Sequence, residues 1–292
     1  MSSQQHDRDR ATLIGSTAIF MWSTLALLTA LSGNIPPFQL TAMSFTVAFA
    51  IAVVFWVKQK ISIISALKLP FKVWILGIFG LFGYHFFYFL ALQNAPVVEA
   101  NLINYLWPLL IVLLSAFLPG EQLKWFHIVG AIAGFIGAGL LVTKGESFSF
   151  DPQYAIGYLA ALICAFTWSC YSVLSRLFGA IPTYSVGGFC GATAILAWIC
   201  HIFFEPTIFP ARAEWLAILG LGLGPVGLAF FTWDYGVKQG NIKILAALSY
   251  SVPLFSTVLL IVFGLAEPSI SVIFACLLIF CGAVLAAKDY FK

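Results

Sequence analysis

The residues best suited to chemistry in this chain are polar and aromatic side chains that lie inside long apolar runs. Tyr84, His85 and Tyr88 form one such group, and the two tyrosines are four residues apart, so they share one face of a helix. Tyrosine hydroxyl groups in apolar surroundings need partners, which a water-filled cavity supplies. His85 can bind a carboxylate, carry a proton or hydrogen-bond a neighbouring helix, and these three roles stay open. The group predicts ring stacking and hydrogen bonding rather than covalent chemistry.

Two tryptophans and two proline-bearing stripes extend this chemistry. Trp22 and Trp168 lie deep in apolar runs, where an indole offers a flat face for stacking and one N–H donor, or simply packs between helices. Polar residues recur at helical spacing in two further runs, where they can also join helices. These stripes are Asn101, Tyr105 and Pro108 in one run, and Ser249, Tyr250 and Pro253 in the other.

The motifs of membrane-embedded enzymes are missing from the sequence. HExxH, GxSxG and Walker A patterns do not occur, and the six cysteines show no metal-ligand spacing. Asp234 is the one carboxylate near a run interior, and Lys238 four residues later predicts an ion pair. Glu99 opens an apolar run, where a helix N-terminus favours a carboxylate. We therefore expect no catalytic residues, no metal and no cofactor.

Composition indicates the elements that must position these side chains. The chain is 62% hydrophobic and 9% charged, with a mean hydropathy of +1.01. So few charges cannot cover a water-facing surface, which excludes a soluble globular protein, a nucleic-acid-binding protein and a disordered chain. The lipid bilayer is the expected surrounding, and in hydrocarbon each spanning run must be helical. Ten spans are predicted, at 12–31, 38–57, 73–92, 97–117, 125–143, 155–175, 183–204, 214–236, 242–263 and 269–287.

Positive charges test this count and set an orientation. With the N-terminus in the cytoplasm, twelve Lys and Arg residues fall on the inner side, and only Lys144 and Arg212 fall on the outer side. Such an asymmetry is typical of membrane proteins and predicts that both termini are cytoplasmic. The inner residues are Arg8, Arg10, Lys58, Lys60, Lys68, Lys72, Lys124, Arg176, Lys238, Lys243, Lys288 and Lys292.

The two halves of the chain repeat each other. Phe20–Ser23 (FMWS) matches Phe166–Ser169 (FTWS) 146 residues later, and Tyr105–Pro108 matches Tyr250–Pro253 145 residues later. Gly137 and Gly282 are also 145 residues apart. We therefore predict an all-α membrane protein of two inverted five-helix repeats, residues 1–145 and 146–292, because an odd number of spans reverses the second half. Pro108 and Pro253 would kink equivalent helices as paired gates.

These features together carry a resemblance to a known family. The FxWS motif of each half, Tyr84–Tyr88 (YHFFY) and Glu99–Pro108 (EANLINYLWP) are similar to the EamA branch of the drug/metabolite transporter superfamily, and within it to bacterial exporters of aromatic amino acids. The resemblance implies export of aromatic and other neutral amino acids across the bacterial inner membrane by alternating access. Alternatives are export of other metabolites or cationic drugs and, less favoured, a membrane-embedded enzyme or an ion channel.

The expected site is a central cavity near the bilayer midplane. Its predicted lining is Trp22, Tyr84, His85, Tyr88, Asn101, Tyr105, Trp107, Trp168 and Tyr250. Trp107 faces away from Tyr105 on an ideal helix, so the kink at Pro108 would have to turn it inward. The partner is a small neutral or aromatic amino acid, with no obligate protein partner. Facilitated and proton-coupled transport stay open, as does the role of Gly130 and Gly134, a GxxxG pair that serves either a dimer or packing within the chain.

Overall fold

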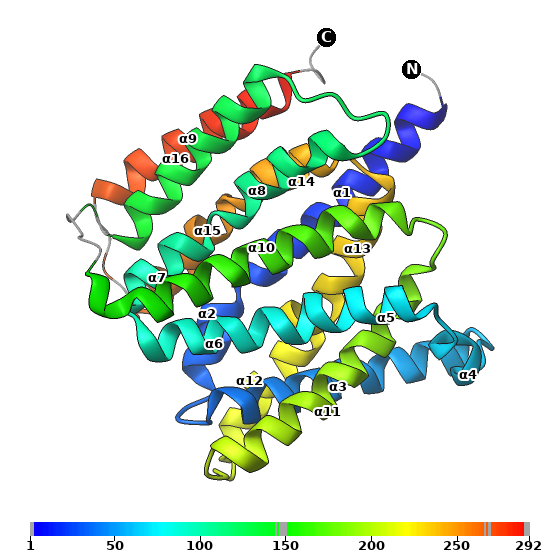
Figure 1. The fold of residues 1–292 in the computed structure, drawn as a ribbon. Helices are drawn as coiled ribbons and strands as arrows, with labels where there is room; N and C mark the ends of the chain where they lie inside the picture. The colour runs from blue at the N-terminus through cyan, green and yellow to red at the C-terminus, as the bar shows by residue number, and fades with distance from the viewer. Residues whose placement is uncertain (1–2, 144, 146–150, 266, 268–269, 289–292) are drawn as a thin grey trace.

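Helices make up the regular structure of this protein, as hydrocarbon requires of apolar spanning segments. The computed structural model describes residues 3–143, 145, 151–265, 267 and 270–288, and the regular elements in these ranges are all helical (Figure 1). The first half contains α1 (Ser3–Ser23), α2 (Leu25–Leu31), α3 (Pro37–Lys58), α4 (Ile63–Leu67), α5 (Phe71–Ile78), η1 (Phe79–Gly83), α6 (Tyr84–Asn94), α7 (Val97–Asn104), α8 (Trp107–Leu114), η2 (Ser115–Phe117) and α9 (Trp125–Val142). The second half contains η3 (Pro152–Tyr154), α10 (Ala155–Leu177), η4 (Thr183–Ser185), α11 (Val186–Phe204), α12 (Arg212–Leu223), η5 (Gly224–Leu228), α13 (Ala229–Gln239), α14 (Ile242–Ser249), α15 (Ser251–Val262) and α16 (Ile270–Ala286).

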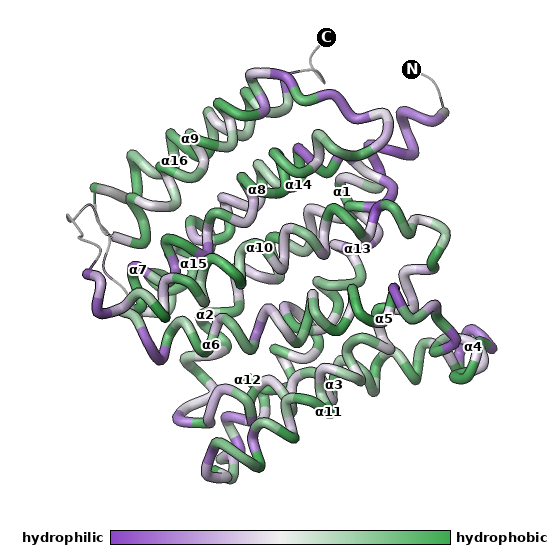
Figure 2. Tube along the Cα trace, viewed as in Figure 1, coloured by the Kyte–Doolittle hydropathy of each residue, from purple (hydrophilic) through white to green (hydrophobic). Residues whose placement is uncertain are grey.

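The predicted ten-span architecture is confirmed. Within the described ranges, nine continuous helical stretches are long and apolar enough to cross a membrane, and α16 contributes a shorter apolar helix. The observed ends lie within three residues of the predicted ones, except that the first helix begins at Ser3 because the polar segment before the apolar run is also helical. Hydrophilic residues gather toward the helix ends and loops (Figure 2). Lys144 and Lys292, which count in the charge asymmetry, lie outside the described residues.

The contacts between helices are symmetric with respect to the two halves of the chain. The last helices of the halves, α9 and α16, pack on each other at one edge, and α3 packs on α11 at the opposite edge (Figure 1). Between them, α1 packs against α13 in the same way that α10 packs against α6. Each contact has its counterpart with the halves exchanged, which is the relation expected of a pseudo-two-fold axis.

Four helix interruptions come in two pairs, each pair separated by 145 residues. The π turns η1 and η5 interrupt the third and eighth spans at equivalent places. The fourth span breaks after Tyr105 and the ninth at Tyr250, just before Pro108 and Pro253. Proline carries no N–H and is tolerated in the first turn of a helix, so each half-helix restarts around its proline. A further break at Thr24 separates α1 from α2, whereas α10 runs unbroken.

Small residues bring the helices at the α9 edge into close contact. A Cβ atom on Gly130 would lie 2.5 Å from the carbonyl oxygen of Gly282, and the ring of Tyr250 covers Gly134. The GxxxG pair therefore serves packing within the chain. Gly222, from the GxGxxG pattern Gly222–Gly227, likewise lies against Val47 of α3.

Replacing Gly130 with alanine should destabilise the protein. The added methyl group meets backbone rather than a flexible side chain, so α9 and α16 must separate, at a cost of about 1–3 kcal/mol. Gly139→Ala is the matched control, since its Cβ would meet only the end of the Leu102 side chain at 3.3 Å. Thermal unfolding in detergent should give a lower midpoint for Gly130→Ala than for Gly139→Ala. Equal midpoints would show that this helix contact is not tight.

Candidate functional site

The two FxWS motifs meet at the centre of the molecule. Trp22 at the end of α1 and Trp168 in the middle of α10 pack edge to face, with ring centroids 5.6 Å apart and an interplanar angle of 80°. The indole N–H of Trp22 donates to the carbonyl oxygen of Pro225 at 3.1 Å, inside the π turn η5. A π turn shifts the register of backbone hydrogen bonds, which explains how a carbonyl inside a span accepts a side-chain donor.

Two more indoles complete what we call the tryptophan cluster, Trp22, Trp107, Trp168 and Trp233. Trp107 lies 6.2 Å from Trp22 and 6.4 Å from Trp168, so the helix break before Pro108 does turn it toward the centre. Trp233 lies 5.0 Å from Trp22 and donates its N–H to the Ser172 hydroxyl at 3.0 Å. Trp233 was missing from the predicted lining, although the 145-residue offset pairs it with Tyr88.

Polar side chains of α6 and α7 form a wall beside the cluster. This polar wall consists of Tyr84, Tyr88, Asn101 and Asn104. The Tyr88 hydroxyl donates to Asn101 Oδ1 at 2.7 Å, and Asn104 Nδ2 donates to the Tyr84 hydroxyl at 3.0 Å. The two tyrosine rings stack 6.1 Å apart and nearly parallel, and Tyr84 lies 5.7 Å from Trp168. Asn104 was not predicted, but it shares the helical stripe of Asn101 and Tyr105.

One acceptor of the polar wall remains free. Among the described residues, buried Asn104 Oδ1 has no hydrogen-bond partner. An unpaired buried acceptor is costly, so a donor from a bound solute or a water molecule would be favoured there.

His85 adjoins the wall, with its ring 5.4 Å from that of Tyr84. Its Nδ1 lies 2.7 Å from the carbonyl oxygen of Leu81, and because a carbonyl only accepts, Nδ1 carries the proton. The ring packs edge-on against Phe45 at 5.2 Å and lies 6.4 Å from Phe230. This arrangement leaves Nε2 as the nitrogen available to a solute.

The predicted residues differ in exposure. The residues that remain half-buried are Trp22, Tyr84, His85, Tyr88, Asn101 and Tyr105. Trp107 and Trp168 are buried, as are the two helix-breaking prolines, Pro108 and Pro253. Tyr250 lies apart from the others, because its ring packs on Gly134 and lies 6.4 Å from Phe135 of α9.

A single carboxylate ties the central helices together at the end of the molecule where α1 begins. Glu121 Oε1 lies 3.2 Å from Arg8 and 2.9 Å from Arg176, and its Oε2 lies 2.7 Å from Lys243. We call these four residues the Glu121 network. Burial raises the pKa of the Glu121 carboxyl, but the Lys243 hydrogen bond and the three positive charges outweigh burial and hold the pKa below its usual value. The network therefore links both halves with an ionised carboxylate.

The carboxylates that were expected to be structural have partners. Asp234 pairs with Lys238 at 2.8 Å, as predicted, and also accepts from the Thr183 hydroxyl at 2.8 Å. Glu99 accepts from the Tyr158 hydroxyl at 2.5 Å, linking the start of α7 to α10. In the part of the chain that the structure describes, no three His, Cys, Asp or Glu side chains are grouped to hold a metal ion.

Comparison with known proteins agrees with this arrangement. The EamA-like transporter family model matches residues 10–143 and again residues 155–287. An aromatic amino acid exporter YddG from Ancylobacter novellus is 53% identical over 280 residues, covering 96% of this chain and 97% of that protein. YddG of Escherichia coli is 23% identical over 270 residues, covering 86% of this chain and 88% of that protein.

A solved crystal structure has the same fold. It superimposes with a TM-score of 0.92 at 52% sequence identity, covering 97% of this chain and 98% of that one. The family match covers both halves of the chain, and each half carries its own copy of the motif that meets in the tryptophan cluster. This chain belongs to the EamA-like transporter family.

Proposed function

We propose that this protein exports aromatic and other neutral amino acids across the bacterial inner membrane by alternating access and does not alter them chemically. The observation that carries the proposal is the junction of the two halves, where a tryptophan cluster adjoins a hydrogen-bonding wall. The relative from Ancylobacter novellus, which is named an aromatic amino acid exporter and is 53% identical, supports the same substrate class.

The proposed site divides the solute between two kinds of surface. The ring stacks against Trp22 and the buried indoles Trp107 and Trp168, since aromatic pairs favour edge and offset contacts. The amino and carboxyl groups face the polar wall, His85 and Tyr105. Asn104 Oδ1, a free acceptor, suits the ammonium group. We assign Tyr250 a hinge role instead, because its packing on Gly134 keeps it away from the cluster.

Charge placement favours a solute without net charge. The proposed lining contains no Asp, Glu, Lys or Arg, and the closest predicted acid, Asp234, is already paired with Lys238. A site for cationic drugs needs an uncompensated carboxylate within the membrane. A zwitterionic amino acid instead needs dipolar partners for both of its charges, which hydroxyl, amide and imidazole groups supply.

Gating follows from the charged residues at the end where α1 begins, which we propose is cytoplasmic because positive residues concentrate there. The Glu121 network joins elements of both halves at this end, and the Asp234–Lys238 pair ties α13 to the segment after α10. We infer that these contacts close the inner side while the half-buried polar wall serves the outer side. Pro108 and Pro253 would act as hinges, because α8 and α15 each restart at an interrupted backbone.

Truncation of a wall tyrosine should weaken transport, because the polar wall is proposed to hold the amino acid end of the solute. Tyr88→Ala removes a stacked ring and one hydrogen bond, and a loss of about 1.4 kcal/mol raises KM about tenfold. The measurement is phenylalanine uptake into everted vesicles, together with cell growth on toxic aromatic analogues. Cells expressing the unaltered protein should resist the analogues.

The matched control is Trp125→Ala, which removes an aromatic side chain that is 61% exposed on α9. Its KM should equal that of the unaltered protein. Unchanged sensitivity to every analogue would reject the proposed substrate class, whereas an unchanged KM in Tyr88→Ala would reject only the proposed lining.

Replacing Glu121 with glutamine should loosen the inner closure in a pH-dependent manner. A carboxyl whose folded-state pKa is lowered stabilises the protein above its usual titration range, and this stability is lost as pH falls through the lowered pKa. Glu121→Gln should therefore reduce the thermal midpoint by several degrees near neutral pH, and the difference should vanish in acid. Glu267→Gln, at an exposed position, is the control. A difference that persists unchanged in acid would contradict the assigned role of the charge.

A further inference from the structure

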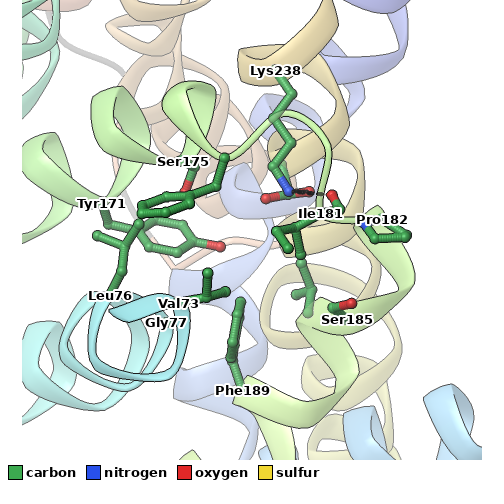
Figure 3. Close-up of a pocket in the computed structure, with 13 residues that line it drawn as sticks. Val73, Leu76, Gly77, Tyr171, Ser175, Ile181, Pro182, Ser185, Phe189 and Lys238 are labelled. Carbon is green, nitrogen blue, oxygen red and sulfur yellow. Dashed lines mark hydrogen bonds and ion pairs between the residues drawn. The ribbon is translucent and has the colours of Figure 1, made fainter. Parts of the chain in front are cut away.

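A small cavity lies beside Tyr171 of α10, with Ser185, Phe189 and Lys238 in its walls (Figure 3). Its walls come from α5, α10, the segment after α10, α11 and α13, and the space suits about one water molecule, with about 10 Å³ available. Tyr171 connects it to the site above, because its ring stacks on Trp168 at 5.2 Å and 30°. We call it the Asp234 cavity.

An ion pair of opposite charges borders this cavity. The side chains of Asp234 and Lys238 are 2% and 7% exposed, and their charged atoms lie 2.8 Å apart. Lys238 also donates to the carbonyl oxygen of Ile181 at 3.0 Å, and Thr183 donates to Asp234. A buried ion pair contributes little net stability compared with apolar residues of similar size, so its presence here calls for another role.

Two buried hydroxyl groups at the same cavity lack partners. Among the residues described, neither the Tyr171 hydroxyl nor the Ser185 hydroxyl makes a hydrogen bond of good geometry, although Ser175 and Asp234 lie near Tyr171. Both residues are 1% exposed, and both line the cavity. Unsatisfied hydroxyl groups are unfavourable unless some state of the protein gives them a partner.

We propose that the Asp234 cavity is a second solute site, at the inner mouth of the transporter, that holds the zwitterionic end of an amino acid. Asp234 receives the ammonium group, Lys238 receives the carboxylate, and the Tyr171 and Ser185 hydroxyls complete the hydrogen bonds. With the inner side closed, the two charges pair with each other and the space shrinks. With it open, a solute replaces that pairing and then passes along Tyr171 to the tryptophan cluster.

The apolar walls fit this assignment. Gly77 lies directly against the ring of Phe189, and Gly80 lies against the ring of Tyr171, so α5 and η1 approach α10 and α11 without intervening side chains. Movement of the third span at its π turn would separate these rings and enlarge the cavity beside the charged pair. The inference rests on the proposed function.

The sharpest test removes the two hydroxyl groups. Tyr171→Phe and Ser185→Ala delete atoms without partners, so the thermal midpoint should not fall. Everted vesicles expose the cytoplasmic face to the medium, and phenylalanine added there should inhibit transport with an inhibition constant about tenfold higher in the double variant. Tyr235→Phe, beside Asp234 but outside the cavity lining, should leave it unchanged. An inhibition constant unchanged in the double variant would overturn the second site.

Solute analogues test the charged pair. Lys238→Met should weaken inhibition by phenylalanine but not by phenylethylamine, which lacks the carboxylate. Asp234→Asn should weaken inhibition by phenylalanine but not by 3-phenylpropionate, which lacks the ammonium group. The double variant Asp234→Asn/Lys238→Gln leaves no unpaired charge. If a single variant fails to fold, the double variant tests whether inhibition by phenylalanine weakens. Inhibition that weakens equally for all three solutes in a single variant would contradict the assignment of Asp234 to the ammonium group and Lys238 to the carboxylate. An unaltered protein that transports no phenylalanine would contradict the proposed function itself.

Discussion

Hydrocarbon leaves a peptide backbone no hydrogen-bond partner except itself, and the rest of this structure depends on that constraint. Irregular backbone is tolerated only where protein covers it. The interruptions at η1, η5, Tyr105 and Tyr250 all lie in spans that pack against the central helices α1 and α10. The same turns free carbonyl groups, and Pro225 uses one to hold the Trp22 indole. The backbone cost of these breaks is therefore confined to places where the two halves pack on each other.

Contact between Trp22 and Trp168 explains why a duplicated motif suits a transporter. Because the halves are inverted, each FxWS motif reaches the centre from the opposite side, and the two indoles share one surface. Rocking of one group of helices against the other then changes access to that surface without dismantling it. Charged groups are kept at the ends, where the Glu121 network joins the halves. Aromatic stacking at the centre and ion pairs at the end thus have separate tasks.

The sequence predicts the span count and most helix ends, because polarity along the chain records where hydrocarbon begins and ends. It also places Trp22 and Trp168 together in the predicted cavity lining, since the repeat assigns them equivalent places. Trp233 was missed, because a side chain's direction in an interrupted helix depends on a π turn that hydropathy does not reveal. Asn104 was also missed, although it shares the helical stripe of Asn101 and Tyr105. Tyr250 was expected in the cavity lining because its motif matches that of Tyr105. The two halves pack against different neighbours at these positions, and the ring of Tyr250 packs on Gly134 instead.

The measurement that tests the central claim most directly is a structure of the protein with bound 4-bromophenylalanine, located by the anomalous signal of bromine. The account predicts bromine beside the tryptophan cluster, within contact of Trp22 or Trp168, and the amino acid end against Tyr84, Tyr88 and Asn104. Bromine found only on the lipid-facing surface of the helices, with the junction of the two halves unoccupied, would contradict it.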